Sequence, residues 1–65
     1  MTDDEILDAF HKAFLEHNAN KERPDVTDES YCETYDAAAS AEKAMADRFG
    51  PEGWGRYRAK YPNSN

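Results

Sequence analysis

The two histidines and the single cysteine are the first candidates for chemistry, because imidazoles and thiolates bind metals and act as bases or nucleophiles. His11 and His17 are six positions apart in this 65-residue chain, so on one helix they would point about 240° apart and could not share a metal ion. Cys32 lies among acidic neighbours, Glu29 and Glu33, whose charge disfavours the reactive thiolate. The sequence therefore predicts no catalytic residue, no metal site and no cofactor, and we expect Cys32 to be a half-buried small residue.

Aromatic and basic residues alternate near the C-terminus, an arrangement that can bind other molecules without catalysis. This segment could stack on nucleobases and hold phosphates, or it could pack its aromatic side on the rest of the chain. Trp, Tyr and Arg are also the residues enriched at the energetic centres of protein interfaces. We therefore predict that the partner-binding residues are Trp54, Arg56, Tyr57, Arg58 and Tyr61.

A second candidate surface is a row of acidic residues, Glu29, Glu33, Asp36 and Asp47. Such a row can be a solvated helix face, or it can imitate the phosphates of a nucleic acid. Lys43 interrupts the row, which argues against the imitation. The net charge of −6 disfavours direct binding to nucleic acid or to an anionic membrane.

Helices must position these residues, and the ends of two helices can be recognised in the sequence. Thr2 and Glu5 have the spacing of a capping box, and apolar residues then recur at helical intervals. This pattern predicts a first helix over about residues 3–18. Thr27 can cap a second helix, which is rich in alanine and should span about residues 28–49.

Gly50 and Pro51 form the usual stop signal after a helix. Beyond them, aromatic and basic residues at i, i+3, i+4 and i+7 predict a short third helix over about residues 52–60. No strand pattern is present in the sequence. We therefore expect one small all-α domain, residues 1–65, built from a helix hairpin and a short C-terminal helix.

One face of the second helix carries an apolar stripe with an acid in it. By a rise of 1.5 Å per residue the second helix should be about 33 Å long and the first about 23 Å, so the first cannot cover the whole stripe. Chains this short are marginally stable alone and often pair with a partner chain. The sequence thus predicts a homodimer through the second helix, with Glu42 either reaching water or setting the register of the pair. The predicted seam is Tyr31, Tyr35, Ala38, Glu42, Met45 and Phe49.

No run of apolar residues is long enough to span a membrane, and the acidic start is unlike a signal peptide. A lone cysteine fits a reducing compartment. These features predict a cytoplasmic protein that does not contact a membrane.

In size, acidity and lack of motifs the chain resembles the small accessory or inhibitor proteins that bacteriophages and mobile elements encode. This resemblance implies a non-catalytic interaction protein that modulates or inhibits a macromolecule, such as a host protein or a defence system. The alternative is an oligomer that sequesters a nucleotide or another anionic ligand with the aromatic-basic segment. An enzyme is not expected, because 65 residues rarely form a pocket with converging polar groups.

Overall fold

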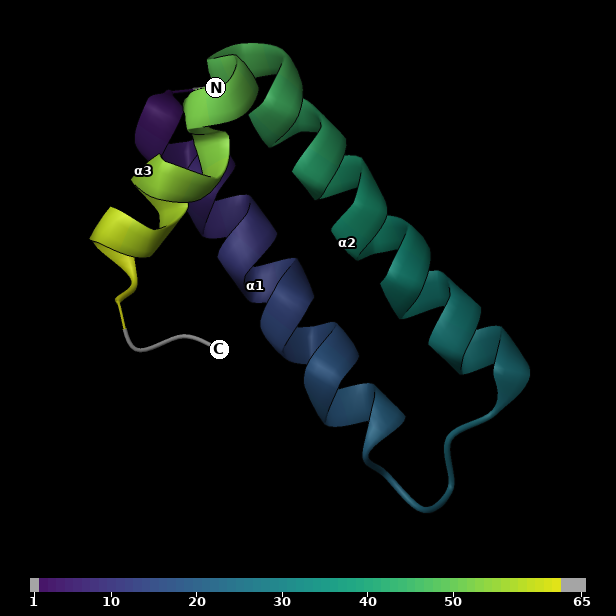
Figure 1. The fold of residues 1–65 in the computed structure, drawn as a ribbon. Helices are drawn as coiled ribbons and strands as arrows, with labels where there is room; N and C mark the ends of the chain where they lie inside the picture. The colour runs from purple at the N-terminus through teal and green to yellow at the C-terminus, as the bar shows by residue number, and fades with distance from the viewer. Residues whose placement is uncertain (1, 63–65) are drawn as a thin grey trace.

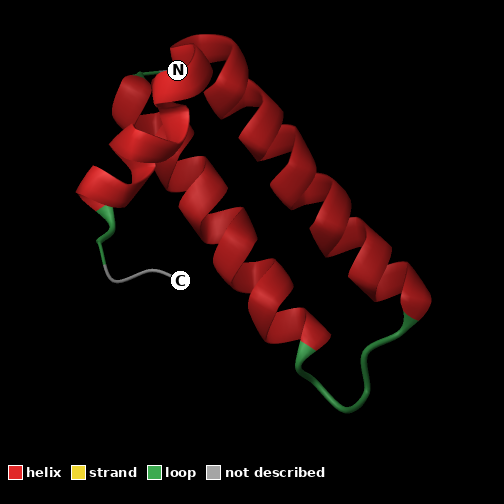
Figure 2. Cartoon of the chain, in the orientation of Figure 1, coloured by secondary structure: helices red, strands yellow, loops and turns green. Residues whose placement is uncertain are grey.

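The structure is a computed structural model that describes residues 2–62, and these residues form an all-helical fold, as the sequence predicts. Helix α1 spans Asp3–Lys21 and helix α2 spans Asp28–Phe49. The short 3₁₀ turn η1 (Gly50–Glu52) then leads into helix α3 (Gly53–Lys60). Helices α1 and α2 lie side by side and antiparallel, and α3 packs near the start of α1, at the end of the hairpin opposite the connecting loop (Figures 1 and 2).

The helix ends are held by the local signals seen in the sequence. The Thr2 hydroxyl accepts a hydrogen bond from the Glu5 backbone N–H at 3.2 Å, and the Glu5 carboxylate accepts one from the Thr2 backbone, which completes the capping box. The Thr27 hydroxyl accepts from the Ser30 backbone N–H at 3.1 Å. Gly50 ends α2 with a φ of 61°, a conformation that favours glycine. These caps explain why α2 begins and ends where the sequence predicts.

The predicted end of the first helix, at residue 18, is wrong, because α1 continues to Lys21. The last turn is held against α2 by polar side chains. Asn20 donates to the Thr34 hydroxyl at 3.3 Å and accepts from the Ser30 hydroxyl at 3.0 Å. With 19 residues, α1 is about 28 Å long, so it falls short of α2 by less than the sequence indicated.

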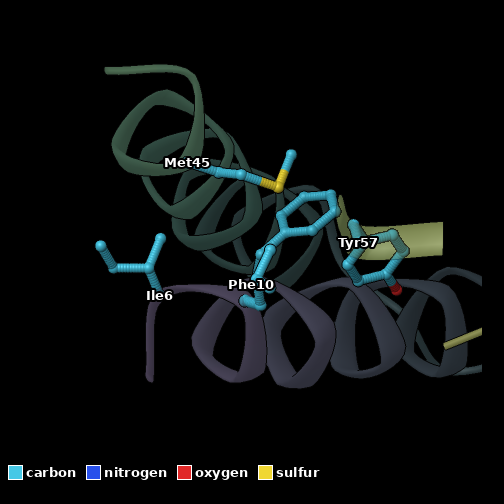
Figure 3. Close-up of a cluster of buried hydrophobic side chains, with 5 residues drawn as sticks. Ile6, Phe10, Met45 and Tyr57 are labelled. Atoms are coloured by element: carbon cyan, nitrogen blue, oxygen red, sulfur yellow. The ribbon is translucent and has the colours of Figure 1, made fainter. Parts of the chain in front are cut away.

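The hydrophobic core lies at the end of the hairpin where α3 packs. The Phe10 ring lies between the side chains of Met45 and Tyr57 (Figure 3), and only 2% of Phe10 is exposed. The ring centroid of Phe10 is 5.3 Å from that of Trp54 and 5.0 Å from that of Tyr57. The buried hydrophobic residues are Ile6, Leu7, Phe10, Met45 and Tyr57.

Helix α3 packs closely against this core at Gly53. A Cβ atom added at Gly53 would come within 3.2 Å of the Met45 Cγ atom, so the missing side chain is what permits the close approach. In the part of the chain that the structure describes, no helix has the length and apolar character needed to cross a membrane.

Candidate interaction surfaces

Two aromatic residues of the predicted partner-binding set, Tyr57 and Tyr61, contact α1. Tyr57 is buried, with its hydroxyl oxygen 3.0 Å from the His11 Nδ1 atom. The Tyr61 ring is stacked on the His11 ring, with centroids 3.8 Å apart and planes 4° apart. Any contact of Tyr57 with a partner would require its ring to leave the core.

The basic residues of α3 differ in how far they are neutralised. Lys60 Nζ lies 2.7 Å from an Asp8 carboxylate oxygen and 3.3 Å from one of Asp4. Arg56 lies over the Phe49 ring, 5.0 Å from its centroid, and pairs with the carboxylate of Glu52 at 3.7 Å. Arg58 is exposed and forms no ion pair with any residue from 2 to 62. It therefore remains a cation that a partner can neutralise.

Asp8 is the centre of a charged cluster that fastens α3 to α1. It accepts hydrogen bonds from the Lys60 ammonium group and the Tyr61 hydroxyl group. These two bonds, the Lys60 bond first, hold the pKa of Asp8 below its ordinary value. The same bonds to the Asp8 carboxylate raise the pKa of Lys60 and the pKa of Tyr61.

We expect α3 to dock most firmly on α1 between about pH 4 and pH 10. Because the pKa of Asp8 is lowered by folding, its contribution is present above its ordinary pKa and is lost as the pH falls below about 4. Because the pKa values of Lys60 and Tyr61 are raised, their contributions are lost as the pH rises above about 10. The fluorescence of Trp54, which lies on α3, should follow both transitions.

Asp8→Asn is the control for this pH profile, because it removes the charge but keeps the size of the side chain. The chain has other carboxylates, so only the difference between the two proteins reports on Asp8. We expect the variant to have shallower acid and alkaline transitions than the wild type. Identical profiles would show that the Asp8 cluster does not hold α3.

Trp54 is the large aromatic residue of α3 that remains accessible. It is 43% exposed, yet its ring is fixed by edge contacts to Phe10 and Tyr57, with centroids 5.3 and 6.0 Å away. Arg58 follows four positions later, so both lie on neighbouring parts of one helix face. These two residues of the predicted partner-binding set are therefore exposed one turn apart on α3.

The predicted acidic row lies on the side of α2 turned away from α1, as follows from its helical spacing relative to buried Met45. All four residues are exposed. Lys43, which interrupts the row in the sequence, binds the Asp47 carboxylate at 2.9 Å. The row is thus partly neutralised near its C-terminal end, whereas Glu29, Glu33 and Asp36 form no ion pair with any residue that the structure describes.

The predicted seam on α2 is divided between two environments. Met45 is buried and Phe49 is half-buried at the core end. Tyr31 and Tyr35, by contrast, are 42% and 54% exposed. At their level a different residue, Thr34, faces α1 and bonds the His17 Nδ1 atom at 2.9 Å.

Sequence reasoning did not single out the polar contacts at this end of the hairpin, which involve Asn20, Ser30 and Thr34. The available signal was the spacing of small residues along α2. Ser30, Thr34, Ala38 and Ala41 continue at helical intervals into Met45, and this line, not the tyrosines, faces α1.

An open groove lies between α1 and α2 beside the exposed tyrosines. Its volume is about 180 Å³, and its lining is mostly apolar. The His17 ring meets the rings of Tyr31 and Tyr35 edge-on, with centroids 4.9 and 5.8 Å away. The groove is lined by Phe14, His17, Tyr35, Ala38, Ala39 and Glu42.

The side chains best suited to catalysis or metal binding, Cys32, His11 and His17, do not converge on one site. Cys32 is exposed, so the expectation that it is half-buried is wrong; it lies on the α2 flank away from the α1 contact. His11 and His17 bond different residues, Tyr57 and Thr34. Within residues 2–62, no three His, Cys, Asp or Glu side chains gather as metal ligands would.

The chain matches no known protein family, no curated protein and no solved structure.

Proposed function

We propose that the protein is a small acidic, non-catalytic interaction protein that binds another protein and modulates or inhibits it. The observation that carries the proposal is the exposed Trp54 indole, held by edge contacts to Phe10 and Tyr57. Arg58, one helical turn later, forms no ion pair within residues 2–62. The partner surface that suits this pair has an apolar pocket for the indole, next to carboxylates for the guanidinium. The contact centres on α3.

The geometry of Trp54 supports this role on energetic grounds. Binding must offset the entropy lost when side chains become fixed, and a ring that is already fixed loses less. Trp and Arg are the types that most often dominate the free energy of a protein interface. The rest of the scaffold is acidic, which keeps a small protein soluble and favours a partner with basic patches beyond the pocket.

The alternative, sequestration of a nucleotide or another anion, has less support. It would need several cations to converge on the ligand. Lys60 is committed to Asp4 and Asp8, and Arg56 is paired with Glu52. An anion at α3 would therefore bind to Arg58, while the neighbouring cations Arg56 and Lys60 are already paired with carboxylates.

A small inhibitor of the kind that phages and mobile elements encode, which the sequence resembles, would be one such interaction protein. In that setting the target is a host enzyme or a defence complex. Inhibition then requires only that the bound protein cover a functional surface of the target. The exposed acids of α2, Glu29, Glu33 and Asp36, form a second surface that such a target can contact.

Arg58→Glu is expected to weaken partner binding by about 30-fold, the effect of losing a contact worth roughly 2 kcal/mol. The partner is first identified by affinity capture from a host lysate and mass spectrometry. Its affinity for the purified wild type and variant is then measured by calorimetry. Arg58 is exposed and forms no ion pair with the other described residues, so the substitution should leave the fold intact.

Lys12→Glu is the matched control. Lys12 is also exposed and lies about 200° around α1 from Phe10, the α1 residue that Trp54 contacts. The substitution changes the net charge by the same amount. We expect its affinity to stay close to that of the wild type. A double variant, Glu33→Lys with Asp36→Lys, tests the acidic row. If the double variant abolished binding while Arg58→Glu did not, the partner would bind the row and the proposed contact would be wrong.

A further inference from the structure

The groove between α1 and α2 is a mostly apolar feature that the described part of the chain leaves uncovered. It occupies the half of the hairpin that α3 does not reach. Phe14 and His17 form its α1 wall, and Tyr35 stands beside it with more than half of its surface exposed. Burying such rings against a partner would be favourable by about 25 cal/mol per Å² of apolar surface.

The chain exposes more surface than a monomer of its size usually does. Its accessible surface is 4709 Å², whereas about 4,200 Å² is typical of a folded monomer of 7.4 kDa. Its radius of gyration is 12.4 Å, against about 10.7 Å for a compact 65-residue domain. Two copies that each covered the excess of about 500 Å² would bury about 1,000 Å², the size at which specific interfaces begin.

The α2 wall of the groove has a spacing that fits a second copy of itself. Its residues are Tyr35, Ala38, Ala39 and Glu42, at positions i, i+3, i+4 and i+7. This spacing reads the same in both directions, as an antiparallel helix pair requires. With a two-fold axis between the two alanines, Ala38 meets the Ala39 of the second copy, and the small side chains allow the helix axes to approach to about 8 Å.

The same alignment places Tyr35 opposite the Glu42 of the second copy. Neither the Tyr35 hydroxyl nor the Glu42 carboxylate has a hydrogen-bond partner within residues 2–62. Across the axis the phenol can donate to the carboxylate, and this happens twice by symmetry. The pairing would satisfy the acid that interrupts the apolar lining, which is otherwise costly to cover.

We propose that a second copy of this chain covers the groove, with the two α2 helices antiparallel about an axis between Ala38 and Ala39. The seam then uses Tyr31, Tyr35 and Glu42, while Met45 remains in the core of its own chain. The partner-binding surface at Trp54 and Arg58 lies on α3, outside the groove. The dimer is therefore independent of the proposed function, and each can fail without the other.

Sedimentation equilibrium from micromolar to millimolar concentration tests the proposal. The apparent mass should rise from the chain mass of 7.4 kDa towards twice that value. Because each copy carries a net charge of −6, added salt should screen their repulsion and strengthen the dimer. A chain that stayed at its monomer mass throughout would leave the groove to a different partner and overturn the proposal.

Ala39→Glu should raise the dissociation constant of the dimer at least about 100-fold, because it brings two like charges together at the axis. Ala37→Glu is the matched control: Ala37 is also exposed, but it lies about 200° around α2 from Ala39. Circular dichroism should show that both variants have the same helix content as the wild type. Equal weakening by the two substitutions would mean that the groove is not the interface.

Cysteine cross-linking tests the antiparallel register. In a Cys32→Ser background, a Tyr35→Cys chain mixed with a Glu42→Cys chain should form the mixed disulfide readily. Each variant alone should cross-link poorly, because its two cysteines would be offset by about 10 Å along the helices, beyond the reach of a disulfide. Efficient cross-linking of Tyr35→Cys to itself would contradict the antiparallel arrangement.

Discussion

Phe10→Ala is expected to cost about 3–5 kcal/mol of unfolding free energy, a large share of the total stability of a domain of this size. Phe10 is 2% exposed and contacts the rings of Phe14, Trp54 and Tyr57. Its removal opens a cavity where α1, α2 and α3 meet, and few other hydrophobic side chains within residues 2–62 are buried. Urea unfolding followed by far-UV circular dichroism measures the loss.

Leu15→Ala is the control for this prediction. Leu15 belongs to the same helix, but 49% of it is exposed, so its truncation should change stability by less than about 0.5 kcal/mol. Both proteins should be measured at low concentration, so that association between copies does not add to the stability. If Phe10→Ala unfolded at the same urea concentration as Leu15→Ala, the core described here would not be what stabilises the chain.

The parts of the fold that the sequence predicted well are those set by local chemistry. The Thr2 capping box, the Thr27 cap and the Gly50 stop act within one turn of helix, so neighbouring residues suffice to recognise them. The end of α1 was missed because it depends on contacts with a distant part of the chain. By residue type Asn20 is typical of a loop, but in the structure its side-chain amide forms hydrogen bonds with Ser30 and Thr34 of α2.

The surfaces were harder to predict than the helices, because their exposure depends on how each helix is rotated. The spacing of the aromatic residues in α3 placed them on one face, but it did not determine which ring would enter the core. In the structure Tyr57 is buried and Trp54 stays accessible. On α2 the tyrosines were expected to continue the line of Met45, whereas Thr34 takes the place facing α1.

The contrast between the two ends of the hairpin follows from these rotations. At one end, α3 covers the apolar side chains of α1 and α2, and the core forms there. At the other end the helices meet through hydrogen bonds of His17 and Asn20, and the tyrosines turn outward. The stability of a single chain therefore depends strongly on how closely α3 can approach.

Gly53→Leu is expected to lower the unfolding free energy by about 1–3 kcal/mol and to detach α3 from the hairpin. The added Cβ atom alone would lie 3.2 Å from the Met45 Cγ atom, and the rest of the leucine side chain has no space beside a residue that is 1% exposed. This steric effect should exceed the roughly 1 kcal/mol that leucine gains over glycine in a helix. Thermal unfolding measures the loss, and a shift of Trp54 fluorescence to longer wavelength reports the detachment.

Gly55→Leu provides the matched comparison, since it makes the same substitution two positions later in α3. No atom lies within 4 Å of a Cβ added at Gly55, so only the gain in helix propensity remains, and stability should rise by about 0.5–1 kcal/mol. The two variants should therefore move in opposite directions. If both were stabilised, α3 would not need its close approach to Met45. In that case the rigid placement of Trp54, on which the partner-binding proposal depends, would lose its structural basis.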